Sequence, residues 1–288
     1  MSFCSPMTQL TTPDPIDYLL IGHVTADLQA DQSISLGGTA SFSGLTAARL
    51  GHNVGLVTSC ANDLQLDPLT GIQKWVIPSE KSTVFRNEGL GQTRVQHLYS
   101  SATRITADHI PVPWRDCQLV HLGPIAAEID PNIAELFPNA LLCLTPQGWY
   151  RQADDEGLVR YVDWPEGLPL LARADAVVLS IEDLRGDEQK VEELAGICPL
   201  LVVTESRDGA RVFTEGKVRY FSAPPVELVE DTGAGDIFAA CFFHRFHNTR
   251  DPWEAARFAV QLSACSVTRR RLASIPTLEE IERAKNRN

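Results

Sequence analysis

Short apolar segments that recur along the chain restrict its fold more than any other feature. Each is long enough for one buried strand and too short for a typical buried helix. Helix-like stretches such as 37–51 and 185–197 separate several of them. Because buried strands that alternate with helices are typical of a parallel sheet, the sequence predicts an α/β fold. The apolar segments occupy residues 16–24, 53–60, 117–125, 140–148, 174–183 and 198–206.

One part of the chain departs from this pattern. Residues 82–105 alternate more between polar and apolar side chains, and Gly89–Gly91 lies between the two arms, so we predict a hairpin there. Together with residues from about 28–36, the stretch 82–101 would form a small β lid. The 288 residues suit a single domain, 1–288, that carries this lid.

The charge of the chain excludes two classes of partner. The formal net charge is −12 and the sequence pI is about 5.0. Sequence-independent binding of nucleic acid or of an anionic membrane needs a basic surface, so neither is expected. No apolar run approaches the roughly 18 residues of a membrane span. A nucleotide substrate stays open, because an acidic protein can still bind phosphate locally.

The cysteines predict a reduced environment. The chain has 7 of them, an odd number, and no two form a CxxC pair. A zinc site and a disulfide framework are therefore both disfavoured, and reduced thiols in a cytoplasm are the simplest account. Residues 1–15 lack a basic start and a long apolar core, and we interpret them as a loose leader that is not a signal peptide.

Two glycines stand at the start of an apolar helix, where packing alone does not need them. Gly233, Ala234 and Gly235 lie between a polar loop and the apolar run that begins at Ile237. Amide groups at a helix N-terminus bind anions, and glycine lets a phosphate approach the backbone. Asp236 would repel that phosphate unless it takes a proton from an attacking hydroxyl. The spacing fits phosphoryl transfer to an alcohol, and equally a glycine-rich turn followed by a first-turn acid.

The segment DTGAGD at 231–236 and the apolar helix after it resemble the C-terminal signature of the ribokinase/PfkB carbohydrate kinase family. Residues 37–51 resemble its N-terminal glycine-pair signature, and 202–213 resemble the strand–turn–strand beside the nucleotide. The motifs occur in the family's order and cover nearly the whole chain. The resemblance implies a ribokinase-like three-layer α/β/α sandwich. It also implies an ATP-dependent, Mg²⁺-requiring kinase for a hydroxyl on a small sugar or polyol.

The resemblance assigns roles residue by residue. Asp236 matches the general base, and the anion hole falls on the backbone amides of Gly233, Ala234 and Gly235. The substrate side includes three matched positions: Asp27, Gly37 and Gly38. The nucleotide side includes four: Thr204, Ser206, Gly209 and Thr232.

Some positions depart from the family pattern. Glu230 stands where the family often has Asp, so activation by a monovalent cation is left open. The metal-linked pattern falls on 180–183, which makes Asp183, acting through water on Mg²⁺, the candidate, with Glu182 as the alternative. An acidic helix start would explain the same residues. Ser206 replaces a usual glycine and Val260 a common Asn, and both changes affect positions expected to contact the purine.

The acceptor is predicted from three further features. Phe42 after the glycine pair resembles the branch of inositol and nucleoside kinases. Arg94 lies in a stretch similar to that branch's lid strand, and Gln147 in one similar to its Gln-Gly-aromatic-x-Arg loop. We favour an inositol-like polyol. A nucleoside kinase with Phe42 stacked on a base, and a non-catalytic sensor on the same fold, are the alternatives. A homodimer formed through the lid is left open.

Overall fold

The computed structural model describes residues 13–29, 31–88 and 95–286. Within these ranges a nine-stranded sheet has the order β15-β14-β13-β12-β9-β8-β1-β4-β5. Neighbours from β13 to β5 pair in parallel, whereas β14 and β15 extend one edge antiparallel, which confirms the predicted mainly parallel sheet. The strands are β1 (Tyr18–Ile21), β4 (Val54–Cys60), β5 (Ile72–Pro78), β8 (Leu119–Leu122), β9 (Leu141–Leu144), β12 (Ala176–Ser180), β13 (Leu200–Thr204), β14 (Ala210–Thr214) and β15 (Lys217–Phe221).

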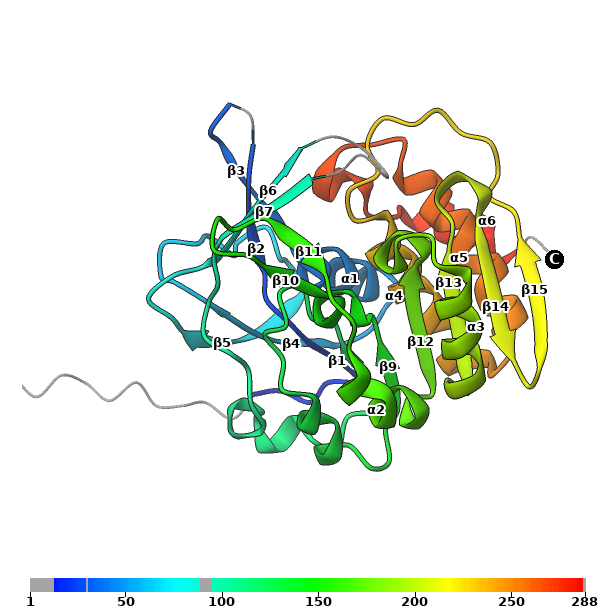
Figure 1. The fold of residues 1–288 in the computed structure, drawn as a ribbon, viewed down its shortest axis with the longest axis horizontal. Helices are drawn as coiled ribbons and strands as arrows, with labels where there is room; N and C mark the ends of the chain where they lie inside the picture. The colour runs from blue at the N-terminus through cyan, green and yellow to red at the C-terminus, as the bar shows by residue number, and fades with distance from the viewer. Residues whose placement is uncertain (1–12, 30, 89–94, 287–288) are drawn as a thin grey trace, which may run out of the picture.

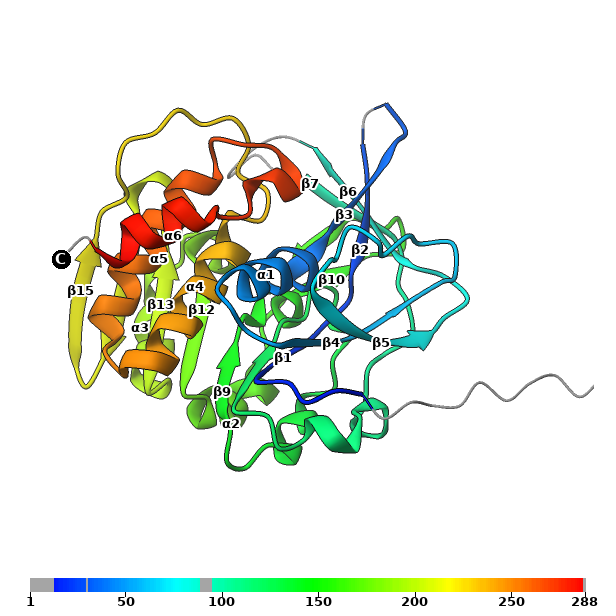
Figure 2. The same ribbon diagram turned by 180° about the vertical axis from the view of Figure 1, so that it is seen from behind.

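Helices cover both faces of this sheet, as expected for a three-layer α/β/α sandwich. Figure 1 shows α2 (Leu168–Arg173) and α3 (Glu188–Ile197) on one face. Figure 2 shows the helices of the other face: α1 (Gly38–Arg49), α4 (Ala234–Thr249), α5 (Pro252–Ser266) and α6 (Leu278–Lys285). Short 3₁₀ turns occur at Ala107–His109, Val112–Trp114, Pro131–Leu136, Pro146–Tyr150, Pro165–Gly167, Ile181–Leu184, Ser206–Asp208 and Arg271–Ser274.

Burial on both faces explains why the central strands are continuously apolar. Along β1, Tyr18 and Leu20 pack into the core beneath α1 and α4, whereas Leu19 and Ile21 pack into the core on the opposite face. All four residues are completely buried. Each large apolar side chain buried in this way stabilises the fold by about 1.5–3 kcal/mol. A polar residue at any of these positions would lose that contribution.

A second, four-stranded sheet with the order β3-β2-β6-β7 lies beside the main one (Figure 1). It comprises β2 (Thr25–Leu28), β3 (Ile34–Gly37), β6 (Thr83–Glu88) and β7 (Val95–Ser100). Strands β3, β6 and β7 fall largely within the two segments from which we predicted a lid, whereas β2 lies mostly before the first of them; the Gly89–Gly91 turn lies outside the described residues. A two-stranded hairpin, β10 (Arg151–Ala153) and β11 (Val159–Tyr161), lies next to β7, where the Leu98 amide donates to the Gly157 carbonyl.

Two of the differences from the sequence-based prediction concern β1 and β5. The segment 16–24, predicted as one strand, ends its pairing in the main sheet at Ile21, and the chain enters the small sheet at Thr25. Strand β5 was not predicted, because its central residues 73–76 alternate between half-buried and exposed and do not form an apolar run. In the described part of the chain, no helix is long and apolar enough to cross a membrane.

Candidate active site

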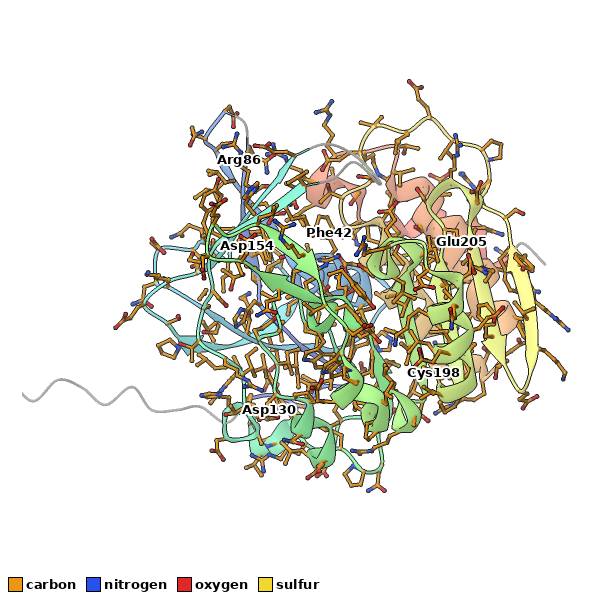
Figure 3. All side chains as sticks on the ribbon, in the orientation of Figure 1. Phe42, Arg86, Asp130, Asp154, Cys198 and Glu205 are labelled. Atoms are coloured by element: carbon orange, nitrogen blue, oxygen red, sulfur yellow. The ribbon has the colours of Figure 1, made fainter. Side chains whose placement is uncertain are left out.

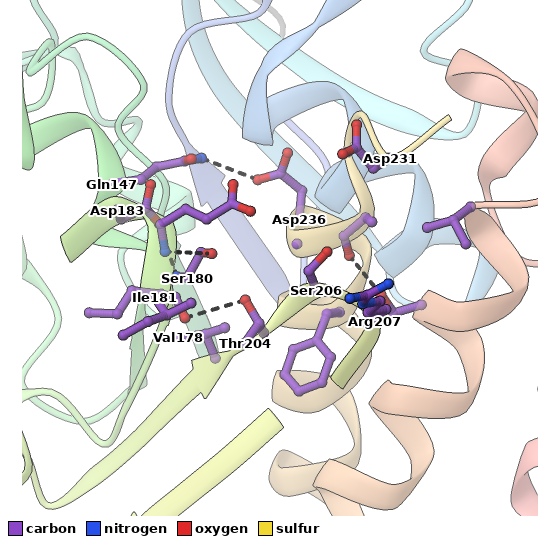
Figure 4. Close-up of a pocket in the computed structure, with 18 of the residues that line it drawn as sticks. Gln147, Val178, Ser180, Ile181, Asp183, Thr204, Ser206, Arg207, Asp231 and Asp236 are labelled. Carbon is purple, nitrogen blue, oxygen red and sulfur yellow. Dashed lines mark hydrogen bonds between the residues drawn. The ribbon is translucent and has the colours of Figure 1, made fainter. Parts of the chain in front are cut away.

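A cleft of about 1010 Å³ opens at the carboxyl ends of β9, β12 and β13. Its walls come from the segments that follow these strands, from the N-terminus of α4 and from α5. Ligands of open α/β sheets bind at this edge, because the loops there diverge from the ends of the strands. In Figure 4, Gln147 and Asp236 point toward each other, and Thr204 and Ser206 lie below them.

Asp236 lies in the first turn of α4 and is held by side chains that are distant in the sequence. The Thr39 hydroxyl donates to Asp236 Oδ1 at 2.7 Å. Gln147 Nε2 donates to the Thr39 oxygen at 2.9 Å and approaches Asp236 Oδ1 at 3.4 Å. Ser43, one turn after Thr39 on α1, donates to the Asp236 carbonyl at 2.8 Å. Helix α1 therefore positions both the backbone and the carboxylate of Asp236.

The pKa of Asp236 is raised from 3.8 to about 6. Removal of the carboxylate from bulk water is the main cause; the Thr39 hydrogen bond and the positive charge of Arg151 lower the pKa, and the charges of Asp183 and Asp27 raise it. A carboxyl group with a pKa near 6 is still ionised at pH 7 and accepts a proton more readily than an ordinary Asp. These are the properties of a general base.

The turn before α4 exposes backbone to the cleft. Gly233 has φ 82° in the left-handed region, and a Cβ there would overlap the Phe42 ring. Both constraints require glycine. The Ala234 amide donates to the Asp231 carbonyl at 3.1 Å inside this turn. Of the predicted anion-hole amides, that of Ala234 is therefore already engaged, whereas the Gly235 amide lies in the first helical turn, where amides lack intrahelical partners.

The other end of the cleft is apolar. Its walls are formed by Ala223–Val226 and Leu228 from the segment after β15, and by side chains from α5 that include Val260 and Ala264. Thr204, Ser206 and Gly209 line the same end, where β13 turns into β14. Gly209 has φ 103°, and a Cβ there would overlap the Phe221 carbonyl. An apolar slot next to a strand turn has the chemistry to hold a flat heterocycle.

Asp183 also lines the cleft, but both of its oxygens have protein partners. Oδ1 accepts from Arg151 Nη2 at 2.8 Å, and Oδ2 accepts from the Ser180 amide at 3.0 Å. Among the described residues, no group of three or more His, Cys, Asp or Glu side chains is arranged to hold a metal ion. A direct metal site is thus not formed by Asp183. This arrangement fits Mg²⁺ that is held mainly by phosphates and water.

The predicted substrate residues of the small sheet lie behind the Asp236 side of the cleft and do not line it. Asp27, on β2, accepts from the Thr25 hydroxyl at 2.7 Å, and its charge raises the pKa of Asp236. A Cβ on Gly37 would overlap the Asp27 carboxylate, so the glycine lets the two segments meet. Gly38 begins α1 with φ 78° one residue before Thr39. Arg94 lies outside the described residues.

Two predicted site residues are not where their roles need them. Phe42 is only 2% exposed and packs against Gly233 near the centre of the molecule (Figure 3), so its ring supports the turn and cannot stack on a ligand. We predicted from its aromatic side chain that Phe42 could stack on a ligand, and its burial excludes this contact. Thr232 is half-buried and does not contribute to the cleft lining, in contrast to Asp231 and Gly233 on either side.

Sequence reasoning missed two residues of the site. Thr39 directly follows the glycine pair and bonds Asp236, and Arg151 ends the Gln-Gly-aromatic-x-Arg segment and pairs with Asp183. Both lie inside motifs already singled out. Their position just after Gly38 and Gln147 could have identified them as site residues. Their hydrogen-bond partners could not be predicted, because these lie far away in the sequence.

Comparison with known proteins supports the family resemblance. Residues 171–278 match the model of the pfkB family carbohydrate kinases. A fructokinase from Klebsiella pneumoniae is 32% identical over 143 residues, which are 44% of this chain and 46% of that protein. A cytidine kinase from Thermococcus kodakarensis is 23% identical over 268 residues, 85% and 94% of the two chains. Over residues 171–278 this chain is therefore similar to the pfkB family carbohydrate kinases.

The match to the curated fructokinases is partial: it spans 46% of the Klebsiella protein and 62% of the Escherichia coli one. Solved structures show the fold of this chain over more of its length. A pyrophosphate-dependent kinase of the ribokinase family, complexed with a pyrophosphate analog and myo-inositol, superposes with a TM-score of 0.79 at 20% identity over 89% of this chain and 98% of its own. Arabidopsis thaliana ribokinase, complexed with ribose and ATP, gives 0.68 at 16% over 96% and 100%.

Proposed function

We propose that this protein is an ATP-dependent kinase that phosphorylates a hydroxyl group of a small sugar or polyol, with an inositol-like acceptor favoured. The observation that carries the proposal is Asp236, an ionised carboxylate with a raised pKa at the glycine-rich start of α4. A carboxylate there would oppose anion binding unless it served as a base. The family match and the fold are consistent with this chemistry.

The reaction follows from the arrangement. Asp236 takes the proton of the acceptor hydroxyl, and the oxygen attacks the γ-phosphorus as the bond to the β-phosphate oxygen breaks, which releases ADP. Thr39 and Gln147 hold the carboxylate in place. The amides at the start of α4 and the positive helix end stabilise charge on the transferred phosphoryl group.

The donor side of the proposal rests on the apolar end of the cleft. The segment 223–228 and the α5 residues Val260 and Ala264 would enclose the adenine, and Thr204 and Gly209 would lie beside it. Mg²⁺ would neutralise donor phosphates, and the Asp183 carboxylate would reach its hydration shell. Arg151, paired with Asp183, adds a positive charge on the same side.

The acceptor side is polar, which favours a polyol over a base. Thr145, Gln147 and Gln96 line the cleft with hydroxyl and amide groups. A nucleoside acceptor is the second candidate, since the cytidine kinase relative matches most of the chain. Phe42, the residue expected to stack on a base, is buried, and this makes the nucleoside less favoured. A non-catalytic sensor would have no use for Asp236 as a base.

The test is ADP release with Mg·ATP against myo-inositol, ribose, fructose and several nucleosides, repeated with pyrophosphate as donor and phosphate release as readout. We expect turnover on a polyol or sugar, its loss in EDTA, and a fall of several orders of magnitude in kcat for Asp236→Asn. Turnover with pyrophosphate alone would refute the ATP assignment. Tight ATP binding by calorimetry without turnover on any acceptor would favour the sensor.

A further inference from the structure

A buried chain of hydrogen bonds crosses the main sheet and ends at the cleft. Tyr18 on β1 contacts His121 Nδ1 on the neighbouring strand β8, with the hydroxyl oxygen 3.0 Å away. His121 Nε2 lies 2.9 Å from the hydroxyl of Thr145, the residue that follows β9. Tyr18 and His121 are completely buried, and Thr145 is 5% exposed and lines the cleft. Neither of the first two residues has a role in the proposed reaction.

The available donors and acceptors determine the direction in which each hydrogen bond of this series is donated. The buried Tyr18 O–H has His121 Nδ1 as its partner, and a buried donor left without an acceptor would destabilise the fold. The tyrosine therefore donates, and Nδ1 accepts. Burial lowers the pKa of His121 to about 3, so the ring is neutral at pH 7 and carries its one N–H on Nε2. That N–H donates to Thr145, whose oxygen is thus an acceptor in this contact.

The hydroxyl hydrogen of Thr145 is therefore available to donate to a different partner. Thr145 precedes the 3₁₀ turn Pro146–Tyr150, yet its side chain makes no capping hydrogen bond there. Within the described chain, its hydroxyl has its one hydrogen bond with His121. Thr145 is also close to the base: a Cβ on Gly123 would lie 3.3 Å from its oxygen and would touch Thr39, which bonds Asp236.

We infer that Tyr18 and His121 act as positioning residues that make Thr145 a hydrogen-bond donor to the phosphoryl acceptor beside Asp236. The inference deepens the proposed function and rests on it for the identity of the ligand. A donor of fixed direction selects a ligand atom with a free lone pair, such as the oxygen of a sugar or polyol hydroxyl, and disfavours an ammonium group. Thr145 is thereby a specificity-determining residue.

The direction can be tested without any substrate. In the histidine ¹⁵N NMR spectrum of the whole protein, His121 should show a protonated Nε2 and an unprotonated Nδ1 from pH 5 to 8. Tyr18→Phe, which removes the donor to Nδ1, should shift the Nδ1 resonance or mix the tautomers. A protonated Nδ1 in the wild type would overturn the inference, and so would a doubly protonated ring at pH 7.

The role of the donor can be tested by kinetics. Thr145→Val keeps the shape and removes the O–H; we expect the acceptor KM to rise about 3- to 10-fold with kcat changed less than about 2-fold. Tyr18→Phe should raise KM by a smaller factor, and it should have no further effect in the Thr145→Val background. Thr46→Val, which removes a buried hydroxyl on α1 outside the cleft lining, is the matched control and should leave KM unchanged.

Two results separate this inference from the proposed function. An unchanged acceptor KM in Thr145→Val, with wild-type turnover intact, would overturn the inference and leave the kinase assignment standing. Equal effects of Tyr18→Phe in both backgrounds would assign Tyr18 a purely structural role and would overturn it as well. A wild type without turnover would refute the kinase assignment. The tautomer of His121 would then by itself decide the direction of the hydrogen bonds from Tyr18 to Thr145.

Discussion

Asp236→Asn should make the protein more stable at pH 8 while abolishing turnover. The folded-state pKa of Asp236 is about 6, against 3.8 for an ordinary solvent-exposed Asp, so the folded chain holds its proton more tightly than the unfolded chain does. Between these two values the folded state binds more protons, and its stability falls as pH rises. Well above pH 6 the carboxylate is ionised in both states, and the free energy of unfolding is then lowered by the full cost of keeping this charge in the cleft.

The magnitude follows from the shift. A difference of about two pKa units corresponds to about 3 kcal/mol at pH 8, and this is an upper value because Asp236 is only half-buried and water reaches the cleft. At pH 4 the same cost is below about 1 kcal/mol, since the folded-state carboxyl is then protonated. Asn keeps an oxygen that accepts from Thr39, so the main hydrogen bond survives the substitution.

The assay is thermal unfolding of the wild type and of Asp236→Asn from pH 4 to 8. For a chain of this size we expect Tm to rise by several degrees at pH 8, at about 2–4 °C per kcal/mol, and the gain to shrink toward pH 4. Asp116→Asn, at an exposed position outside the cleft lining, is the control and should leave Tm nearly unchanged at every pH. A variant that is less stable than the wild type at pH 8 would refute the argument that burial of the charge is costly.

Three further predictions concern the same site. The kcat/KM of the wild type should rise about tenfold per pH unit below pH 6 and level off above it, because Asp236 must be unprotonated to accept a proton; a flat profile would contradict its role. Gly233→Ala should lower the free energy of unfolding by about 1–3 kcal/mol and reduce kcat more than tenfold, since φ 82° and the Phe42 ring both oppose a side chain; wild-type kinetics would contradict this. Gly37→Ala should lower Tm because a Cβ there would overlap the Asp27 carboxylate, and Gly196→Ala on α3, where a Cβ meets nothing within 4 Å, should not; equal Tm values for the two variants would contradict this.

Much of the architecture could be predicted because strands buried on both faces must be continuously apolar. The segments 117–125, 140–148 and 198–206 each contain one strand of the main sheet. The rule fails where only part of a strand is buried, as in β5, and where the chain changes sheets, as between Ile21 and Thr25. At those places pairing with neighbouring strands decides the structure, and a local pattern does not report it.

The candidate site divides in the same way. The glycines at 233 and 235 and the acid at 236 are evident in the sequence, and their order is compatible with an anion-binding helix start and with a glycine-rich turn alike. The carboxylate's partners could not be predicted, because Thr39 and Gln147 lie 197 and 89 residues away from it in the chain. Phe42 shows the converse: its aromatic side chain is evident in the sequence, but its burial under Gly233 is a product of packing.

Apolar periodicity and glycine act locally, so the sequence indicates most of the strands and helices and the places where backbone without side chains is needed. The electrostatics of the site, in contrast, arise from the tertiary structure. The pKa of Asp236 depends on its removal from water and on the charges of Arg151, Asp183 and Asp27, which come from different elements. Burial and distance set these interactions, and both are properties of the folded chain.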